Sequence, residues 1–358
     1  MRAGSQERLQ GVAGGGPQAR PVRGGSRRRG ALALLLLAAA ALSGCGGQQS
    51  ILRSDSHQTH VISVLWWWML AAAGVVFAGA VVLLVLAYVR RGRAGLPFVG
   101  ERESLAGAMV IVFGIAVPLI VLLVLFGASD IYAVRFSEAP PAGSTSMSVE
   151  VKGHQWWWEI HYPGTAAVSA NEIHIPTGTR VRLYATTADV IHSLWVPSLA
   201  RKIDMIPGRT NAILLEAPSP GSYLGQCSEF CGLQHSYMRF TVIAEPRASF
   251  EAWLADMERP AAAPASGEQR EGQQLFMSKG CGGCHRLAGT SAEGTVGPDL
   301  THLATRSTLA ALTIPDTPSE LAAWIENPQA IKPGNHMPDL GLSGAQAKKV
   351  AAFLGEMR

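Results

Sequence analysis

The chain has 358 residues, of which 48% are hydrophobic and 16% are charged, and its formal net charge is +4. Residues 1–44 hold seven arginines and one glutamate, so the remaining chain has 23 basic and 25 acidic residues. The basic balance therefore comes from the N-terminal segment alone. A nearly neutral remainder gives no support for nucleic-acid binding.

The N-terminal segment is typical of an exported lipoprotein. The arginine run 27–29 precedes an apolar stretch, 31–42, that is too short to span a bilayer. Cys45 follows two small residues, as in a lipoprotein cleavage site. We expect residues 1–44 to be a lipoprotein-type signal peptide and Cys45 to carry a lipid. An uncleaved helix with an incidental cysteine is the alternative, and the arginines also resemble a twin-arginine signal.

Two apolar runs predict a transmembrane hairpin within residues 45–135. They cover about 61–89 and 105–126, and each exceeds the roughly 20 residues that a helix needs to cross a bilayer. The loop between them is rich in arginine, so the positive-inside rule places it in the cytoplasm and both outer ends in the periplasm. Pro118 is expected to disturb the second helix. The loop arginines are Arg90, Arg91, Arg93 and Arg102.

Beyond residue 145 the sequence changes to short alternating runs separated by glycine and proline. Val149 and Val151 alternate with charged neighbours, residues 181–184 alternate in the same way, and residues 212–215 are a short apolar run. These are strand and turn signals. About 110 residues are ample for one core, so we expect residues 146–257 to form an all-β sandwich or small barrel.

Two thiols, an imidazole and a thioether lie within twelve residues, at Cys227, Cys231, His235 and Met238. Thiolate and thioether ligands favour copper, and methionine is a poor zinc ligand but a familiar weak ligand of copper. A mononuclear blue-copper site uses one cysteine, so the second thiolate allows two coppers to share both sulfurs. Such a pair suits electron transfer. A zinc site or a disulfide between the two cysteines is the alternative.

A second cofactor motif follows a stretch rich in proline and alanine, residues 258–267, which is expected to be a linker. Cys281, Cys284 and His285 have the spacing for covalent haem attachment, with the histidine as the proximal iron ligand. A redox-active cysteine pair is the alternative, but it gives no reason for the adjacent histidine.

The C-terminal residues 268–358 predict a small all-α domain. The distal haem ligand is expected downstream of these cysteines, and our choice is Met337. A Met/His pair would raise the reduction potential of the haem. His336 and His302 are competing ligands, and an ordinary core methionine is the alternative. The expected helices span about 271–279, 318–326 and 343–357.

The segment from Cys227 to Met238 resembles the CuA loop of cytochrome c oxidase subunit II. The resemblance includes three further segments in the family order, residues 153–158, 189–199 and 202–209. The loop around Met337 resembles the one that presents the axial methionine of class I cytochromes c. The chain thus resembles a bacterial haem-copper oxidase subunit II with a cytochrome c domain fused at its C-terminus.

The resemblance implies a role for several residues. His192 would supply the second imidazole, and the backbone carbonyl of Glu229 would also bind copper, while its carboxylate reaches a magnesium shared with subunit I. Trp156 occupies the position where electrons arrive from cytochrome c. The implied CuA ligands are His192, Cys227, Glu229, Cys231, His235 and Met238. The implied fold is a two-helix transmembrane hairpin, an all-β cupredoxin-like Greek-key barrel and an all-α class I cytochrome c domain.

The implied activity is that of a respiratory cytochrome c oxidase in a bacterial inner membrane, with the redox domains on the periplasmic side. Electrons would pass from a soluble or membrane-bound cytochrome c, or another donor, through haem c and CuA to subunit I. There oxygen is reduced to water with proton translocation, and subunit III is a further expected partner. One departure is that residues 109–112 contain no acid, where the family often has a glutamate that serves the proton path.

Other protein classes carry similar centres. The CuA subunit of a haem-copper nitric oxide reductase is an alternative, because that enzyme differs mainly in its subunit I. A nitrous oxide reductase needs a long histidine-rich propeller and no helical hairpin. This sequence has a hairpin pattern and no such propeller pattern. A free-standing copper and haem electron-transfer lipoprotein would not need two spanning helices.

Overall fold

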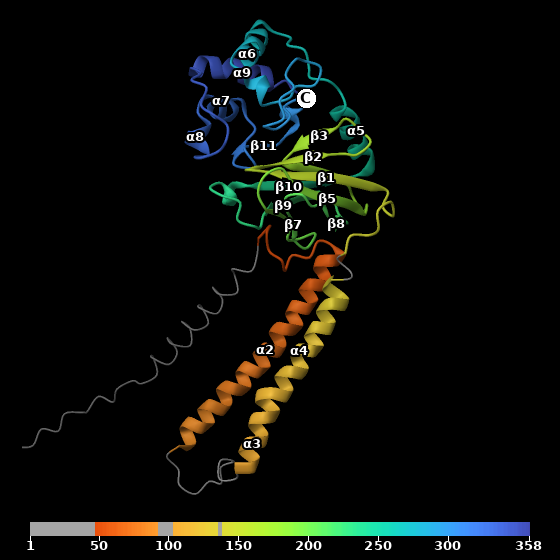
Figure 1. The fold of residues 1–358 in the computed structure, drawn as a ribbon, viewed down its shortest axis with the longest axis vertical. Helices are drawn as coiled ribbons and strands as arrows, with labels where there is room; N and C mark the ends of the chain where they lie inside the picture. Colours follow the sequence, from red (N-terminus) through yellow and green to blue (C-terminus); the bar gives the residue numbers. More distant parts are fainter. Residues whose placement is uncertain (1–46, 92–102, 135–137) are drawn as a thin grey trace, which may run out of the picture. The chain divides into compact units, whose positions relative to one another are not determined.

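The computed structural model describes residues 47–91, 103–134 and 138–358. The signal-peptide and Cys45 predictions fall on residues 1–46 and lie outside the described residues, as do two of the loop arginines. Along the described chain, two long apolar helical segments precede an all-β domain, and short helices follow it (Figure 1). The predicted multidomain fold class is confirmed.

The first apolar segment is one helix, α2 (His57–Arg90). Ser56 caps it, accepting a hydrogen bond from the Thr59 amide, while the Thr59 side chain accepts one from the Ser56 amide. By length and composition, His57–Arg90 and Gly107–Ile131 could each cross a membrane. The second segment contains α3 (Glu103–Ile111), the π-helical η3 (Val112–Ala116), α4 (Val117–Ala128) and the π-helical η4 (Ser129–Val134).

A π-helical turn directly precedes Pro118 in the second apolar segment. Proline has no amide hydrogen, and its ring crowds the carbonyl group four residues earlier, at Gly114. Gly114 lies within η3, where the wider turn makes room for the ring. The disturbance expected from Pro118 therefore takes the form of a local π segment.

Two five-stranded sheets form the β domain. Their strand orders are β3-β2-β1-β5-β8 and β4-β10-β9-β6-β7. The pairs β1/β5 and β4/β10 are parallel, so the chain crosses between the sheets. The strands are β1 (Met147–His154), β2 (Trp157–His161), β3 (Val168–Ala170), β4 (Glu172–Pro176), β5 (Val181–Thr187), β6 (His192–Trp195), β7 (Ile203–Met205), β8 (Asn211–Leu215), β9 (Gly221–Cys227) and β10 (Arg239–Glu245).

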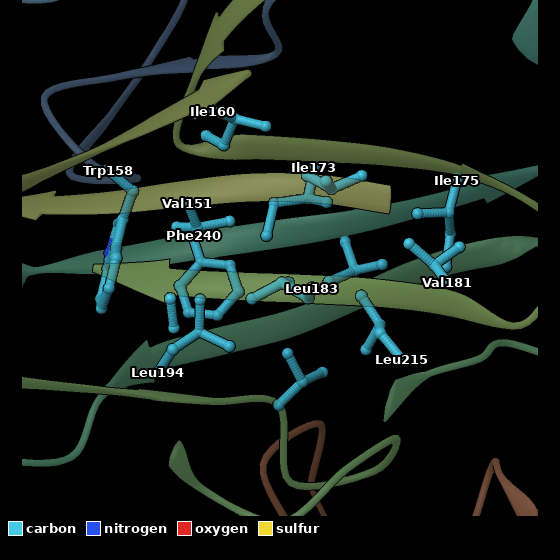
Figure 2. Close-up of a cluster of buried hydrophobic side chains, with 14 of the residues drawn as sticks. Val151, Trp158, Ile160, Ile173, Ile175, Val181, Leu183, Leu194, Leu215 and Phe240 are labelled. Carbon is cyan, nitrogen blue, oxygen red and sulfur yellow. The ribbon is translucent and has the colours of Figure 1, made fainter. Parts of the chain in front are cut away.

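The core of this domain lies between the two sheets. In β1, Val149 and Val151 are buried and the alternating charged residues face solvent, as predicted. Figure 2 shows Val151 together with inward-pointing side chains from strands of both sheets. The rings of Trp158 and Phe240 meet edge to face, with centroids 5.1 Å apart. Burying each such side chain contributes on the order of 2 kcal/mol to the stability of the domain. Because the core holds the two sheets together, it also fixes the positions of the strand ends.

The β domain ends in a helix that the sequence patterns did not predict, α5 (Arg247–Met257). Its Trp253 stacks on the His174 ring, with centroids 3.9 Å apart. The start of α2 is hydrogen-bonded to the loop after β6 in the same domain. Ser56 Oγ donates to the carbonyl of Leu199 at 2.6 Å, and Thr59 Oγ1 donates to that of Ser198 at 2.8 Å.

The C-terminal region consists of short helices, one pair of two-residue strands and the irregular segments between them. The helices expected near 271–279, 318–326 and 343–357 correspond to α6, α7 and α9. The elements are α6 (Gly267–Ser278), η7 (Cys281–Gly283), η8 (Leu303–Thr305), β11 (Thr308–Leu309), β12 (Ile314–Pro315), α7 (Pro318–Glu326), α8 (Pro328–Ile331) and α9 (Gly344–Leu354). Helices α6 and α9 pack closely, and Phe276 meets Phe353 with ring centroids 6.1 Å apart.

Gly272 permits the close approach of α6 to α9. A Cβ atom there would lie 2.0 Å from the carbonyl oxygen of Lys349, so Gly272→Ala must push the helices apart. We expect a loss of roughly 1–3 kcal/mol in stability and faster amide hydrogen exchange in both helices. The matched control is Gly267→Ala, because nothing lies within 4 Å of a Cβ there. Equal protection in the two variants would contradict this account of the packing.

Candidate metal centres

The first candidate centre lies where β9 and β10 meet. The Cys227 amide donates to the Met238 carbonyl at 2.9 Å, which closes the loop between the two strands. Within this loop, Cys231 Sγ lies 3.8 Å from Cys227 Sγ, 3.6 Å from His235 Nδ1 and 3.7 Å from Met238 Sδ. Both cysteines are free and buried. The four sequence-predicted residues of this loop therefore share one cluster.

The fifth side chain comes from a neighbouring strand. His192 begins β6, which pairs with β9 so that Leu194 faces Cys227. The imidazole is fully buried, with Nδ1 3.8 Å from Cys227 Sγ. Its other nitrogen, Nε2, lies 2.8 Å from Asp189 Oδ1. A carboxylate that holds the outer nitrogen fixes the ring and directs the inner nitrogen toward a metal.

Asp189 was not singled out from the sequence, although it stands three residues before the histidine. Burial alone would raise its pKa, but hydrogen bonds from His192 and from the amides of Gln155 and Val190 outweigh burial and lower it. The carboxylate thus stays ionised beside the imidazole. The sequence signal that could have identified Asp189 is an acidic residue three positions before a candidate ligand histidine.

The donor set fits a pair of copper ions. Two sulfurs at 3.8 Å have a nitrogen beside each of them, from His192 and His235. The backbone carbonyl of Glu229 lies 3.2 Å from Cys227 Sγ, and the Glu229 side chain is exposed. The contact between the two sulfurs lowers the pKa of Cys227 to about 4 and raises that of Cys231.

Trp156 is hydrogen-bonded to this cluster. Its Nε1 donates to the Cys231 carbonyl at 2.9 Å, and the Gln155 side chain donates to the same oxygen at 2.7 Å. The indole is only 7% exposed. On its other side it packs against the ring of His336, with centroids 4.8 Å apart. Trp156 thus contacts both the thiol loop and the C-terminal helical region.

The second candidate centre is a mostly apolar cavity of about 610 Å³ in the C-terminal region. Cys281, Cys284, His285 and Met337 all line it. The Nδ1 atom of His285 lies 2.7 Å from the carbonyl of Pro298, which leaves Nε2 for a metal. One wall comes from the β domain and includes Gln155 and Trp157, among other residues. The donors and the apolar lining fit a haem.

The two competing axial ligands differ in position. His302 does not line the cavity, because it is buried with its Nε2 2.9 Å from the carbonyl of Arg259. His336 lines the cavity and packs on Trp156. Met337 is held by its backbone, with its amide donating to Asn335 and its carbonyl accepting from Gln329.

Comparisons with known proteins match both regions. The family described as cytochrome c oxidase subunit II, periplasmic domain, matches residues 167–245, and the cytochrome c family matches residues 269–358. The fold and the matches together define a membrane-anchored β domain joined to a cytochrome c domain.

Curated relatives extend this result. The cytochrome c oxidase subunit 2 of Alkalihalophilus pseudofirmus is 33% identical over 262 residues, covering 72% of this chain and 75% of that protein. The subunit 2 of Bacillus subtilis is 26% identical, with 72% and 76% covered. The chain belongs to the cytochrome c oxidase subunit 2 family. Among solved structures, the periplasmic domain of subunit II from Bradyrhizobium japonicum is 29% identical, covers 33% of this chain and 94% of its own, and has a TM-score of 0.31.

Removing the charge beside His192 tests the first centre. Asp189→Asn leaves the imidazole without its ionic partner, so we expect copper to be held about 10–100-fold more weakly. The measurement is copper retained in competition with a chelator. Asp256→Asn is the matched control, because Asp256 is exposed and pairs with Arg259. An unchanged affinity in Asp189→Asn would show that this carboxylate does not support the metal ligand.

Proposed function

We propose that this chain is the electron-transfer subunit of a respiratory cytochrome c oxidase and passes electrons from haem c through CuA toward subunit I. The observation that carries the proposal is the placement of Trp156. Its ring packs on His336, next to the expected haem ligand, and its Nε1 donates to the carbonyl of Cys231. Trp156 is therefore the residue through which the two centres communicate.

The copper ligands are His192, Cys227, Glu229 by its carbonyl, Cys231, His235 and Met238. When bound, the two coppers would together take up and release one electron. The chain contributes the rigidity: the donors come from β6, β9 and the loop that the Cys227 amide closes. Asp189 orients His192, and burial of the thiols keeps water from the sulfurs. The exposed Glu229 carboxylate is available to a magnesium ion at the contact with subunit I.

Cys281 and Cys284 would hold a haem covalently, and His285 and Met337 would be its iron ligands. When bound, it accepts one electron and passes it on. The hydrogen bond between His285 and the Pro298 carbonyl fixes the ring orientation. Methionine as the second ligand raises the reduction potential, which suits a haem that receives electrons from a cytochrome c or another external donor.

The apolar helices anchor the chain in the inner membrane of a bacterial cell, and both redox domains face the periplasm. Arg90 and Arg91 at the end of α2 mark the cytoplasmic side. Residues 1–44 serve as the signal, and Cys45 carries the lipid. Subunit I reduces oxygen to water with proton translocation, and subunit III completes the complex.

The test is metal analysis and electron paramagnetic resonance of the full chain in detergent, matured with haem and loaded with copper. We expect two coppers per iron and hyperfine structure from one electron shared by two copper nuclei. Cys231→Ser removes one bridging thiolate and should leave the spectrum of a single copper. One copper per chain in the unaltered protein, or zinc in its place, would overturn the proposal.

The axial role of Met337 has a separate test. Met337→Ala should keep the haem covalently attached but lower its reduction potential by about 0.1 V, since axial ligands set haem potentials over a range of roughly 0.8 V. A redox titration of the haem absorption measures the change. Met277→Ala is the control, because Met277 is half-buried in the same domain but does not line the cavity. An equal potential in both variants would exclude Met337 as the ligand.

A further inference from the structure

Lys332 is a buried lysine that joins the two redox domains. Its side chain is only 4% exposed. The ammonium group donates to three backbone carbonyls, those of Trp156 at 3.2 Å, Tyr237 at 3.1 Å and Ala310 at 3.2 Å. The first two belong to the β domain and the third belongs to the cytochrome c domain. One side chain thus satisfies acceptors on both sides of the contact.

Burying an ammonium group among neutral carbonyls is costly. Burial lowers the pKa of Lys332 to about 8, and the ion pairs found among the described residues do not include Lys332. An uncharged side chain of similar length would pack there without that cost. The lysine adds three directed hydrogen-bond donors. We therefore attribute to it a role in fixing the orientation of the two domains and not in stabilising them.

The three carbonyls mark functional positions. Trp156 packs on His336 and is bonded to the thiol loop, while Tyr237 directly precedes the proposed copper ligand Met238. Ala310 lies in a run of three residues with positive φ, from 310 to 312, and its carbonyl also accepts from Thr313 Oγ1 at 2.7 Å. Lys332 itself begins the loop that presents His336 and the proposed haem ligand.

A second contact restricts rotation about this point. The Glu172 carboxylate, buried in β4, accepts hydrogen bonds from the amide of Ser307 at 2.9 Å and from its hydroxyl at 2.7 Å. Beside Lys332, the Gln234 side chain donates to the carbonyl of Pro333. Two separated attachments define an orientation, whereas the linker between the domains supplies only proximity.

We propose that Lys332 is a positioning residue: it docks the cytochrome c domain on the β domain so that His336 meets Trp156, and thereby sets the rate of electron transfer from haem to copper. This inference rests on the proposed function. In the step concerned, the haem iron is oxidised from Fe(II) to Fe(III), and the copper pair takes up that one electron. No bond forms or breaks, and no proton is transferred.

The test compares Lys332→Met with Lys348→Met in the full chain carrying haem and copper. Lys348 lies on the exposed side of α9 and serves as the matched control. After a photoexcited ruthenium complex, added as the external electron donor, reduces the haem, the rate of electron transfer to copper is followed optically. We expect about a tenfold slower transfer in Lys332→Met, which corresponds to about 1.4 kcal/mol of lost docking, with an unchanged copper resonance spectrum. A rate equal to that of the control would overturn the proposal.

Two further measurements separate the possible failures. Amide hydrogen exchange of the segment containing Ser307 reports docking without metal or electron transfer, and it should be faster in Lys332→Met alone. Lys332→Arg keeps the charge and the donors and should restore part of the rate. Unchanged exchange in Lys332→Met would refute the docking role even if the proposed function holds. If exchange is faster in Lys332→Met but the unaltered chain transfers no electron between haem and copper, the docking role stands. The proposed function and the rate role of Lys332 are then refuted.

Discussion

The antiparallel pairing of β9 with β10 is the constraint on which the first centre depends. Because Gln226 faces Arg239 and the Cys227 amide is bonded to the Met238 carbonyl, the intervening residues must fold back on themselves. Two thiols, an imidazole and a thioether are then confined to a few ångströms. The same sheet places β6 beside β9, so the second imidazole arrives from the neighbouring strand. The core between the sheets holds this arrangement rigid, which is what a centre for rapid electron exchange requires.

The sequence was most informative where chemistry is local. The loop from Cys227 to Met238 and the pair Cys281 and Cys284 are visible by spacing, and the alternation in β1 predicted its buried face. Long-range neighbours were not visible in this way. His192 was identified only through a family resemblance, because nothing in its own surroundings shows that β6 pairs with β9. Helix α5 was missed although Phe250, Trp253, Leu254 and Met257 have the spacing of one helical face.

Residues that support a site were harder to find than its ligands. The acceptors of Lys332 are backbone carbonyls, which have no sequence signature, and two of them lie in another domain. Glu172 and Ser307 are separated by more than a hundred residues. Such contacts depend on the relation between folded surfaces. The sequence shows which side chains can form hydrogen bonds. Only the folded structure shows which partners they meet.

The shared wall of the haem cavity has a consequence for how the protein matures. Gln155, Trp156 and Trp157 belong to the β domain, yet they line the cavity proposed to hold the haem. A cavity completed by a second domain is more open while the two domains are apart. If the proposed haem is attached at Cys281 and Cys284, the open cavity favours attachment before docking. Biogenesis would run from a separated, haem-loaded domain to the closed pair, with the linker as the element that permits the delay.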